Sequence, residues 1–292
     1  MTEIIQHLVD AAGLASLYAL LALPVALVYG IMNLVNFAHG ELIMIGAYGL
    51  FIFAAITLPL AAFLALVIVV LAALAMERAA FRPVRGSSPE TLLVTSFAVS
   101  FLLQNAALMI FGSRPKSVET PSLFSQTVTI GGVHIEGVTI LSVGLAVICI
   151  GGLVIFMKRT AFGMAMRAAA EDFTMARLVG IRANAVISGT FAISGVGAGV
   201  AAFILVVQGG SAFATMGLTP VIIAFVATMM GGLGSFSGAL IGAALLGAGT
   251  VAFDVLLPTQ LRSSREAFVY GAVLVVLLIR PQGLVPARRE RV

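Results

Sequence analysis

The sequence predicts an all-α polytopic membrane protein. Hydrophobic residues make up 61% of the 292 residues and charged residues only 10%, whereas about a quarter of a soluble domain is charged. Apolar runs near the spanning length of about 20 residues recur along the chain. Runs such as 58–76 do not alternate, as the strands of a membrane β-barrel would. A chain with so few polar groups cannot fold around one water-soluble core.

Nine apolar segments follow one another and are predicted as transmembrane helices. They are 11–32, 41–57, 59–77, 91–112, 139–157, 185–207, 218–231, 237–257 and 266–280. Some are shorter than a full span, so they could be broken or re-entrant, and eight to ten spans are expected. We expect the whole chain, 1–292, to form a single transmembrane domain.

The basic residues predict the topology. Twelve of the sixteen Lys and Arg fall in the stretches 78–85, 158–182 and 280–291. Basic loops between apolar spans are typical of the cytoplasmic side, so the C-terminus is expected inside and the N-terminus outside, in the periplasm. The pI near 9.7 then reflects topology, and no nucleic-acid partner is expected. The N-terminus has no basic stretch that would indicate a cleaved signal peptide.

The only long loop on the predicted outer side, 113–138, contains "TVTIGGVHIEG". Two short β-prone runs around Gly131 and Gly132 predict a small hairpin. It could contact a soluble partner or be an ordinary loop. Cys149, the only cysteine, lies in an apolar run and is expected to be a small core residue, since it cannot form an intramolecular disulfide.

Two stretches of the sequence resemble each other. "NFAHGELIMIGAYG" (36–49) aligns with "GSFSGALIGAALLG" (234–247), and in each a polar, glycine-containing turn leads into an apolar helix. The first copy ends in "FRPVRG" and the second in "IRPQGL", and each phrase follows its turn by nearly the same number of residues. We infer a three-segment unit used twice in the same orientation, near 20–86 and 219–284, as in many transport proteins. Chance similarity between helices rich in Gly and Ala is the alternative.

Motifs of enzymes are missing from the sequence. The two lysines, Lys116 and Lys158, follow proline and methionine, so no G-x-x-x-x-G-K-[ST] phosphate loop is possible. There is also no G-x-S-x-G motif. The three histidines are far apart in the sequence, and only His39 is close to membrane depth. We therefore expect a non-catalytic chain without a metal or cofactor of its own.

The stretch 158–184, predicted on the cytoplasmic side, contains a helix-prone middle at 164–178. One stripe of the expected helix is formed by Met166, Ala170, Phe173, Ala176 and Arg177, and a neighbouring one by Arg167, Glu171 and Thr174. Arg167 and Glu171 are four residues apart and could pair, and Gly180 lies where the helix could end. The segment is either a docking helix for a cytoplasmic partner or a solvated linker.

The loop resembles a known family. "AAAEDFTMARLVGI" is similar to the cytoplasmic coupling loop of ABC importer permeases, in which an E-A-A box is followed nine residues later by glycine. Glu171 and Gly180 keep that spacing, whereas Asp172 departs from the family's alanine. The form A-E-D-x-x-M-A-x-x-x-G-I resembles the branched-chain amino acid permeases, as do "NFAHGELIMIGAY", "GGLGSFSGALIG" and "RPQGL". The resemblance covers about 10–285 and is to the H-type membrane subunit.

The resemblance implies an importer of the bacterial inner membrane with two permease subunits, two cytoplasmic ATPases and a periplasmic binding protein that selects the substrate. ATP and Mg would be bound in the ATPases, and this chain would form half of the pathway for branched-chain or similar apolar amino acids. The residues expected to couple it to an ATPase are Arg167, Ala170, Glu171, Asp172, Arg177 and Gly180.

Candidates for the translocation pathway lie at the two predicted helix breaks. They are Asn33, Asn36, His39 and Glu41 in the first copy and Ser235 and Ser237 in the second. Ionisable residues inside a membrane indicate function: Glu41 could face an ammonium, and a helix N-terminus could bind a carboxylate. A purely structural role is favoured, in which Glu41 stabilises the first turn, Asn36 caps it, and His39 and Asn33 hydrogen-bond freed backbone.

Gln104 and Asn105 lie inside the fourth predicted span. Adjacent positions on a helix point in different directions, so at most one of them is expected to face a cavity, and interhelical hydrogen bonds are the default for both. The glycines of "SGVGAG" (194–199) and "GGLG" (231–234) are expected to permit close helix packing.

Two other functions remain open from the sequence. The first is a related ABC permease for urea, amides or aromatic acids, whose membrane subunits look similar. The second is an ion-coupled secondary transporter, which would need neither ATPases nor a docking helix within 158–184.

Overall fold

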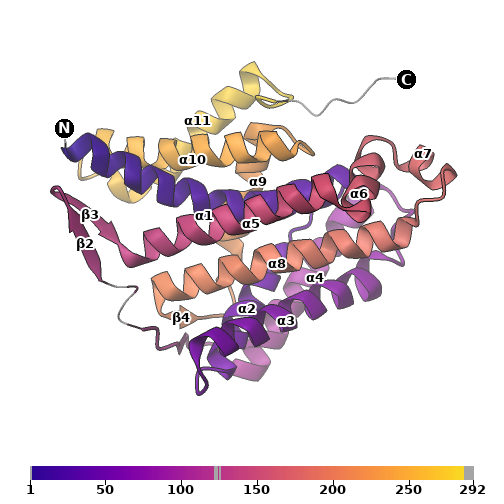
Figure 1. Cartoon of the computed structure of the whole chain (residues 1–292), viewed down its shortest axis with the longest axis horizontal. Helices are drawn as coiled ribbons and strands as arrows, with labels where there is room; N and C mark the ends of the chain where they lie inside the picture. Colours follow the sequence, from indigo (N-terminus) through magenta and orange to yellow (C-terminus); the bar gives the residue numbers. More distant parts are fainter. Residues whose placement is uncertain (1, 122–123, 125, 286–292) are drawn as a thin grey trace.

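The computed structural model describes residues 2–121, 124 and 126–285, and it is predominantly helical (Figure 1). Six helices of this part of the chain are long and apolar enough to cross a membrane. They are α1 (Thr2–Met32), α3 (Leu58–Met76, continued by a π-helical turn at Glu77–Phe81), α4 (Pro89–Phe111), α5 (Gly137–Arg159), α8 (Ala183–Gly209) and α10 (Phe236–Leu256). The shorter helices are α2 (His39–Ile52), α6 (Ala161–Glu171), α7 (Phe173–Leu178), α9 (Leu218–Gly231) and α11 (Arg265–Ile279).

Each of the nine predicted apolar segments coincides with one of these helices, although α1 begins at Thr2 instead of residue 11. Helices α2, α9 and α11 have 14, 14 and 15 residues. At 1.5 Å per residue they are about 21–23 Å long, which is less than the hydrocarbon core of about 30 Å. The structure therefore supports a polytopic helical protein with six full-length spans in its described part.

The long helices lie side by side along the long axis of the molecule (Figure 1). Helix α1 contacts α5, α8, α9 and α10, while α2, α3 and α4 form a group on the other side of α8. One end of the bundle carries the strands β2 and β3, and we call it the hairpin end; the opposite end carries α6 and α7, and we call it the α6 end (Figure 1).

The predicted hairpin is confirmed. Strands β2 (Thr127–Ile130) and β3 (Val133–Glu136) pair antiparallel. The two-residue turn between them has φ of 59° at Gly131 and 86° at Gly132, a left-handed backbone that glycine adopts without steric cost. A second, two-residue pairing joins β1 (Lys116–Ser117) to β4 (Ser211–Ala212), and so ties the loop after α4 to the segment that follows α8.

Glycines bring the helices into close contact, as the sequence predicts. A Cβ at Gly195 would lie 3.0 Å from the Cβ of Ala73, and one at Gly199 would lie 2.6 Å from Leu66 Cδ1. Both contacts join α8 to α3. A Cβ at Gly231, in the second glycine-rich stretch, would collide with the backbone of Gly238. Small residues allow the backbones of membrane helices to approach in this way.

The prediction of one helix over 164–178 is wrong, because the loop forms two helices. Asp172, with φ −144° and ψ 103°, separates α6 from α7, and its carboxylate accepts the Met175 N–H at 2.9 Å. Aspartate is favoured at this N-cap position because it satisfies a free N–H of the first turn. Met166 and Ala176 of the predicted stripe are buried, whereas Ala170 and Arg177 of the same stripe are exposed, so the stripe does not form one buried face.

The predicted end of this segment at Gly180 is confirmed. Gly180 has a φ of +89°, and the Ile181 N–H donates to the Ala176 carbonyl at 3.0 Å, the bond that defines a Schellman ending. Of the predicted basic tail at 280–291, residues 286–291 lie outside the described part of the chain.

Candidate functional site

Two of the short helices, α2 and α9, begin at the same place inside the bundle. Gly40 in the first turn of α2 and Gly217, the residue before α9, meet backbone to backbone, and a Cβ on either would collide with the other. From this point α2 runs towards the hairpin end, where Tyr48 stacks on Phe111 at the end of α4 with the ring centroids 4.0 Å apart. Helix α9 runs towards the α6 end, where Gly231 contacts the first turn of α10.

Each of these two helices packs against the segment that leads into the other. Phe37, just before α2, lies 5.8 Å from the Phe225 ring of α9 between ring centroids. Ala214 and Met216, just before α9, belong to the same buried cluster as Tyr48 of α2. Two helix N-termini, each carrying a partial positive charge, are thus held together within the protein.

Glu41 lies in the first turn of α2, as predicted, and is only 1% exposed. Its Oε1 accepts hydrogen bonds from Ser100 Oγ at 2.8 Å and from Gln104 Nε2 at 2.7 Å, both on α4. Its Oε2 has no hydrogen-bond partner among the described residues. Of the two adjacent amides in the fourth span, Gln104 therefore faces inwards, whereas Asn105 is exposed and donates to its own helix at Phe101 O.

His39 is also buried, at the beginning of α2. Its Nδ1 lies 3.1 Å from Ser194 Oγ on α8, and its Nε2 has no partner in the described part of the chain. The expected hydrogen bond to freed backbone is thus replaced by a side-chain contact with α8. Asn33 has a φ of 52°, a left-handed conformation that asparagine tolerates better than most residues.

The prediction that Asn36 caps α2 is wrong. The N-cap is Ala38, which has helical angles and no side-chain cap. Asn36 stands two residues earlier, and its backbone carbonyl, not its side chain, accepts the His39 N–H at 3.2 Å. Both side-chain polar atoms of Asn36 are buried without a hydrogen-bond partner among the described residues.

The second helix break lies at the α6 end. Ser235 Oγ accepts the Gly238 N–H at 3.0 Å and so caps α10, and Ser237 Oγ lies 3.3 Å from Ser235 Oγ. Both serines line a cavity of about 450 Å³ that Arg167 and Glu171 of α6 also line. The pathway candidates therefore form two groups, one buried where α2 and α9 meet and one beside α6.

The predicted ATPase-coupling residues lie on or beside α6 and α7, at one end of the bundle (Figure 1). All six are exposed: Arg167, Ala170, Glu171, Asp172, Arg177 and Gly180. The ion pairs of the described residues are Glu77–Arg85 and Asp254–Arg265, so the possible pair between Arg167 and Glu171 is not formed. Both side chains are free to contact another molecule.

The sequence reasoning missed a polar network near the α6 end. Glu77, 2% exposed, pairs with Arg85 and accepts a hydrogen bond from Ser188 Oγ at 2.8 Å. Arg85 also donates to Asn184 Oδ1 at 2.7 Å. Burial lowers the pKa of the Arg85 guanidinium, and the adjacent Glu77 partly counteracts this shift. The network ties the end of α3 to the beginning of α8.

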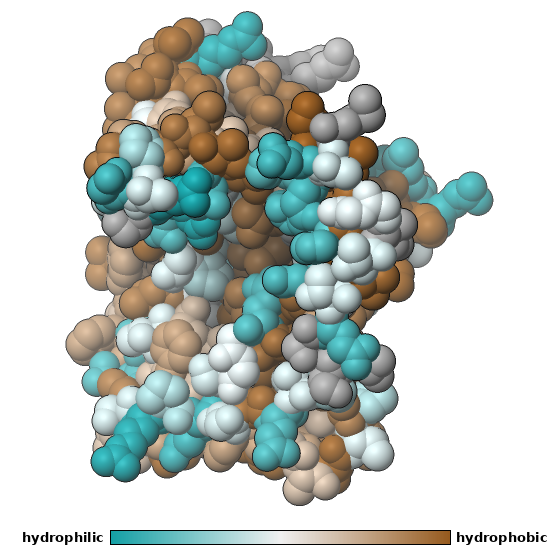
Figure 2. Space-filling view, turned by 90° about the vertical axis from the view of Figure 1, so that its left-hand side faces the viewer, coloured by the Kyte–Doolittle hydropathy of each residue, from teal (hydrophilic) through white to brown (hydrophobic). Residues whose placement is uncertain are grey.

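The hairpin end carries a polar cavity of about 590 Å³ between α1, the hairpin, α5 and α8. Gln6 of α1 fixes the hairpin here: its Nε2 donates to the His134 carbonyl at 2.8 Å, and its Oε1 accepts the His134 N–H at 2.7 Å. Figure 2 shows this end of the molecule, where hydrophilic side chains are spread among apolar ones. The end therefore offers a polar surface to a soluble molecule.

Comparison with known proteins gives consistent results. Residues 7–278 match the family model described as "Branched-chain amino acid transport system / permease component". The chain is 37% identical to the high-affinity branched-chain amino acid transport system permease protein BraD of Pseudomonas aeruginosa, over 96% of this chain and 95% of that protein. It is 32% identical to the corresponding protein LivH of Escherichia coli (strain K12), over 96% and 94%.

A solved structure shares the fold. It is that of PsaBC from Streptococcus pneumoniae in complex with Fab, with a TM-score of 0.51 over 94% of this chain and 92% of that chain. The sequence identity is 12%, so the likeness concerns the arrangement of the helices alone.

Proposed function

Because the chain belongs to the family of branched-chain amino acid permease components, we propose that it is one of two membrane-spanning subunits of an ATP-driven amino acid importer. The observation that carries this proposal is the 37% identity to a branched-chain amino acid permease over nearly the full length of both chains. The substrate class would be branched-chain or similar apolar amino acids, delivered by a periplasmic binding protein.

Energy would come from two separate cytoplasmic ATPases that bind ATP and Mg, and this chain would be non-catalytic. The exposed helices α6 and α7, with Arg167, Glu171, Asp172 and Gly180, would dock on one ATPase. Two features support this role: neither Arg167 nor Glu171 is engaged in an ion pair within the described residues, and Asp172 and Gly180 fix the shape of the loop by a cap and a left-handed turn.

The orientation in the inner membrane follows from the basic loops. The α6 end would be cytoplasmic, because Arg78, Arg82, Arg85, Lys158 and Arg159 lie at the ends of helices on that side. The N-terminus and the hairpin would then lie in the periplasm, where the hairpin end would meet the binding protein. Nine membrane segments would result if α2, α9 and α11 are counted with the six full-length spans.

The proposal includes the internal repeat. The units near 20–86 and 219–284 each contain three helices in the same order, α1–α2–α3 and α9–α10–α11. A polar break precedes the middle helix of each unit, although α2 has 14 residues and α10 has 21.

We place the translocation pathway along α4, against the second permease subunit. The polar residues Thr91, Thr95 and Asn105 fall within one stripe of α4, and Gln104 of the same helix reaches inwards to Glu41. Polar side chains in a span are costly in lipid and mark interfaces and pathways. The buried group around His39 and Glu41 would support α4 on the side that faces away from the pathway. Ser235 and Ser237 would line the cytoplasmic exit of the pathway.

The test is transport by the complete complex in reconstituted vesicles, with the cognate binding protein outside and ATP inside. We expect uptake of leucine and valine that depends on ATP and on the binding protein. Uptake of phenylalanine should be lower than that of leucine, and uptake of urea should be small. ATP-independent uptake by this chain alone, or preference for urea, would contradict the proposal.

A further inference from the structure

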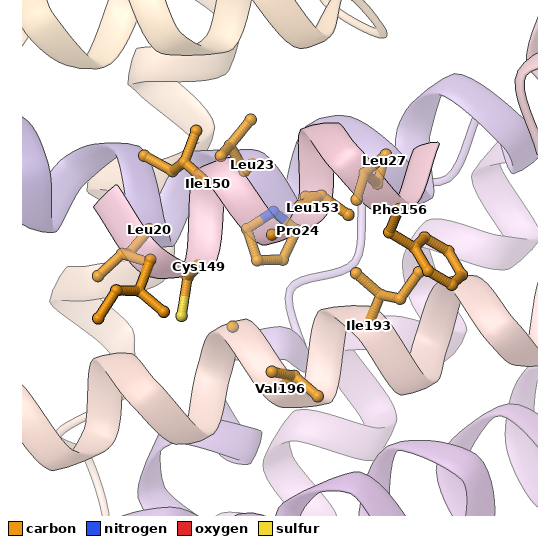
Figure 3. Close-up of a pocket in the computed structure, with 13 residues that line it drawn as sticks. Leu20, Leu23, Pro24, Leu27, Cys149, Ile150, Leu153, Phe156, Ile193 and Val196 are labelled. Carbon is orange, nitrogen blue, oxygen red and sulfur yellow. The ribbon is translucent and has the colours of Figure 1, made fainter. Parts of the chain in front are cut away.

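An apolar pocket of about 280 Å³ lies between α1, α5 and α8 (Figure 3). Two of its lining residues hold α1 and α8 together: Pro24 of α1 packs directly on Gly197 of α8, where a Cβ would lie 2.5 Å from Pro24 Cγ. Cys149 points its sulfur into the space between α5 and α8 (Figure 3), and the other walls are aliphatic apart from Phe156. The pocket offers almost no polar group, so water is not a suitable occupant.

The pocket opens towards the outer face of α5. Ile148 on its rim is 69% exposed, and Ile155, two turns beyond it, is 63% exposed. Gly152, also on the rim, is exposed, and a Cβ there would meet nothing within 4 Å. Residues spaced by three or four lie on one side of a helix, so these three form a continuous apolar stripe that borders the mouth.

This stripe ends in a positive charge. Arg159, the last residue of α5, continues it by helical spacing, four residues after Ile155 and seven after Gly152. It is exposed and makes no ion pair among the described residues. Lys158, the neighbouring residue, lies on a different side of the helix, because successive residues are rotated by about 100°. The basic group and the mouth of the pocket therefore share one side of α5.

The dimensions fit a lipid. From Cys149 to Phe156 the pocket follows eight residues of α5, about 10 Å along the helix axis, and Arg159 stands one turn beyond Phe156. An arginine at a helix end extends its guanidinium to the membrane interface, where lipid phosphates lie, and guanidinium is well suited to bind them. An acyl chain descending from that phosphate would run along the stripe into the pocket.

We propose that this pocket is a binding site for one acyl chain of an anionic phospholipid, whose headgroup phosphate is bound by Arg159. The lipid belongs to the leaflet in which α5 ends. A lipid is favoured over a protein surface as the occupant, because the exposed face of α5 between residues 147 and 156 carries no polar side chain. In contrast, α4 has the polar residues Thr91, Thr95 and Asn105 within one stripe.

The test uses the assembled transporter in membranes containing phosphatidylglycerol with a photoreactive group midway along one acyl chain. After illumination, we expect adducts concentrated on 148–156, above the level on the lipid-exposed face of α3 around Leu71, which is 59% exposed. Phosphatidylglycerol should label this stretch about fivefold more than phosphatidylcholine with the same chain, the preference expected of one basic residue near the surface.

Two pairs of variants separate the pocket from its surroundings. Gly152→Leu, which fills the mouth, should reduce the adducts to the level on α3, whereas Gly144→Leu, at an equally open exposed position of α5 outside the pocket, should not. Arg159→Gln should abolish the preference for phosphatidylglycerol, whereas Lys158→Gln should preserve it. The proposal would be overturned by equal labelling of 148–156 and α3, or by protection of 148–156 by the second permease subunit. Equal effects of the two variants within either pair would also overturn it.

Discussion

Gly40 and Gly217 touch backbone to backbone at the point where α2 and α9 begin. The two residues are far apart in the sequence, yet neither position has space for a single additional carbon. The contact holds two helices of 14 residues each with their N-termini together inside the bundle. Neither helix spans the membrane alone, and their fixed meeting point positions His39 and Glu41.

This contact predicts the effect of one methyl group. Gly217→Ala would place its Cβ against the Gly40 carbonyl and should destabilise the subunit by about 1–3 kcal/mol or more, as overpacking of a tight core does. The apparent Tm of the purified complex measures the loss. Gly209→Ala is the matched control, since a Cβ there meets nothing within 4 Å; a similar fall in Tm for both variants would contradict the prediction.

The Glu41 carboxylate allows its structural and transport roles to be separated. Glu41→Gln retains an oxygen that can accept from Ser100 and Gln104, so the apparent Tm should stay near that of the parent. Glu41→Leu leaves both donors unsatisfied and should cost about 1–3 kcal/mol. If the role is structural, the Gln variant should also transport leucine at the normal rate. Loss of transport by this stable variant would instead indicate that the charge meets the substrate.

The loop that contains α6 and α7 should be sensitive at its two shape-determining residues. Asp172→Ala removes the cap of α7, worth about 0.5–2 kcal/mol, and Gly180→Ala forces a left-handed backbone on alanine, at about 1–2 kcal/mol. We expect both variants to insert normally and to lose transport-coupled ATP hydrolysis, measured in vesicles with the binding protein and leucine. Lys158→Gln, beyond the loop's helices, is the control; full coupling in both loop variants would rule out docking through this loop.

The buried pair of Glu77 and Arg85 should be more important for stability than for transport. Glu77→Ala leaves the Arg85 guanidinium without its counter-charge and should cost about 3–5 kcal/mol. Glu77→Gln can still accept from Ser188 and Arg85 and should cost less. Thermal unfolding of the complex gives the order of the variants, and an Ala variant as stable as the parent would show that the pair contributes nothing to stability.

The long helices could be predicted from the sequence because apolar runs in a lipid environment have few other options. The arrangement of α2 and α9 could not, since a short buried helix and a short span have the same composition. Their distinguishing feature is the contact between Gly40 and Gly217, which joins residues from opposite halves of the chain. Local sequence patterns cannot predict a contact between residues so far apart in the chain.

The sequence also predicts the site only in part: it identifies single residues but not their partners. Glu41 was identified because a carboxylate in an apolar run is unusual, but its partners on α4 are 59 and 63 residues away. One signal was present: Ser100 and Gln104 are four residues apart on an otherwise apolar span, and such a pair lies on one side of a helix. The break at Asp172 could also be predicted from the sequence, because aspartate is a strong N-cap residue. The expectation of one continuous helix left this signal out.

The short pairing of β1 with β4 connects two regions that the membrane spans otherwise separate. Lys116 and Ser117 are joined to Ala212 and Ser211, and Gly217 follows only five residues after Ala212. In the proposed orientation, a soluble protein that pulls or presses on the loop after α4 would act, through this two-residue ladder, on the segment that fixes the start of α9. A contact made on that loop would in this way be mechanically linked to the surroundings of His39 and Glu41.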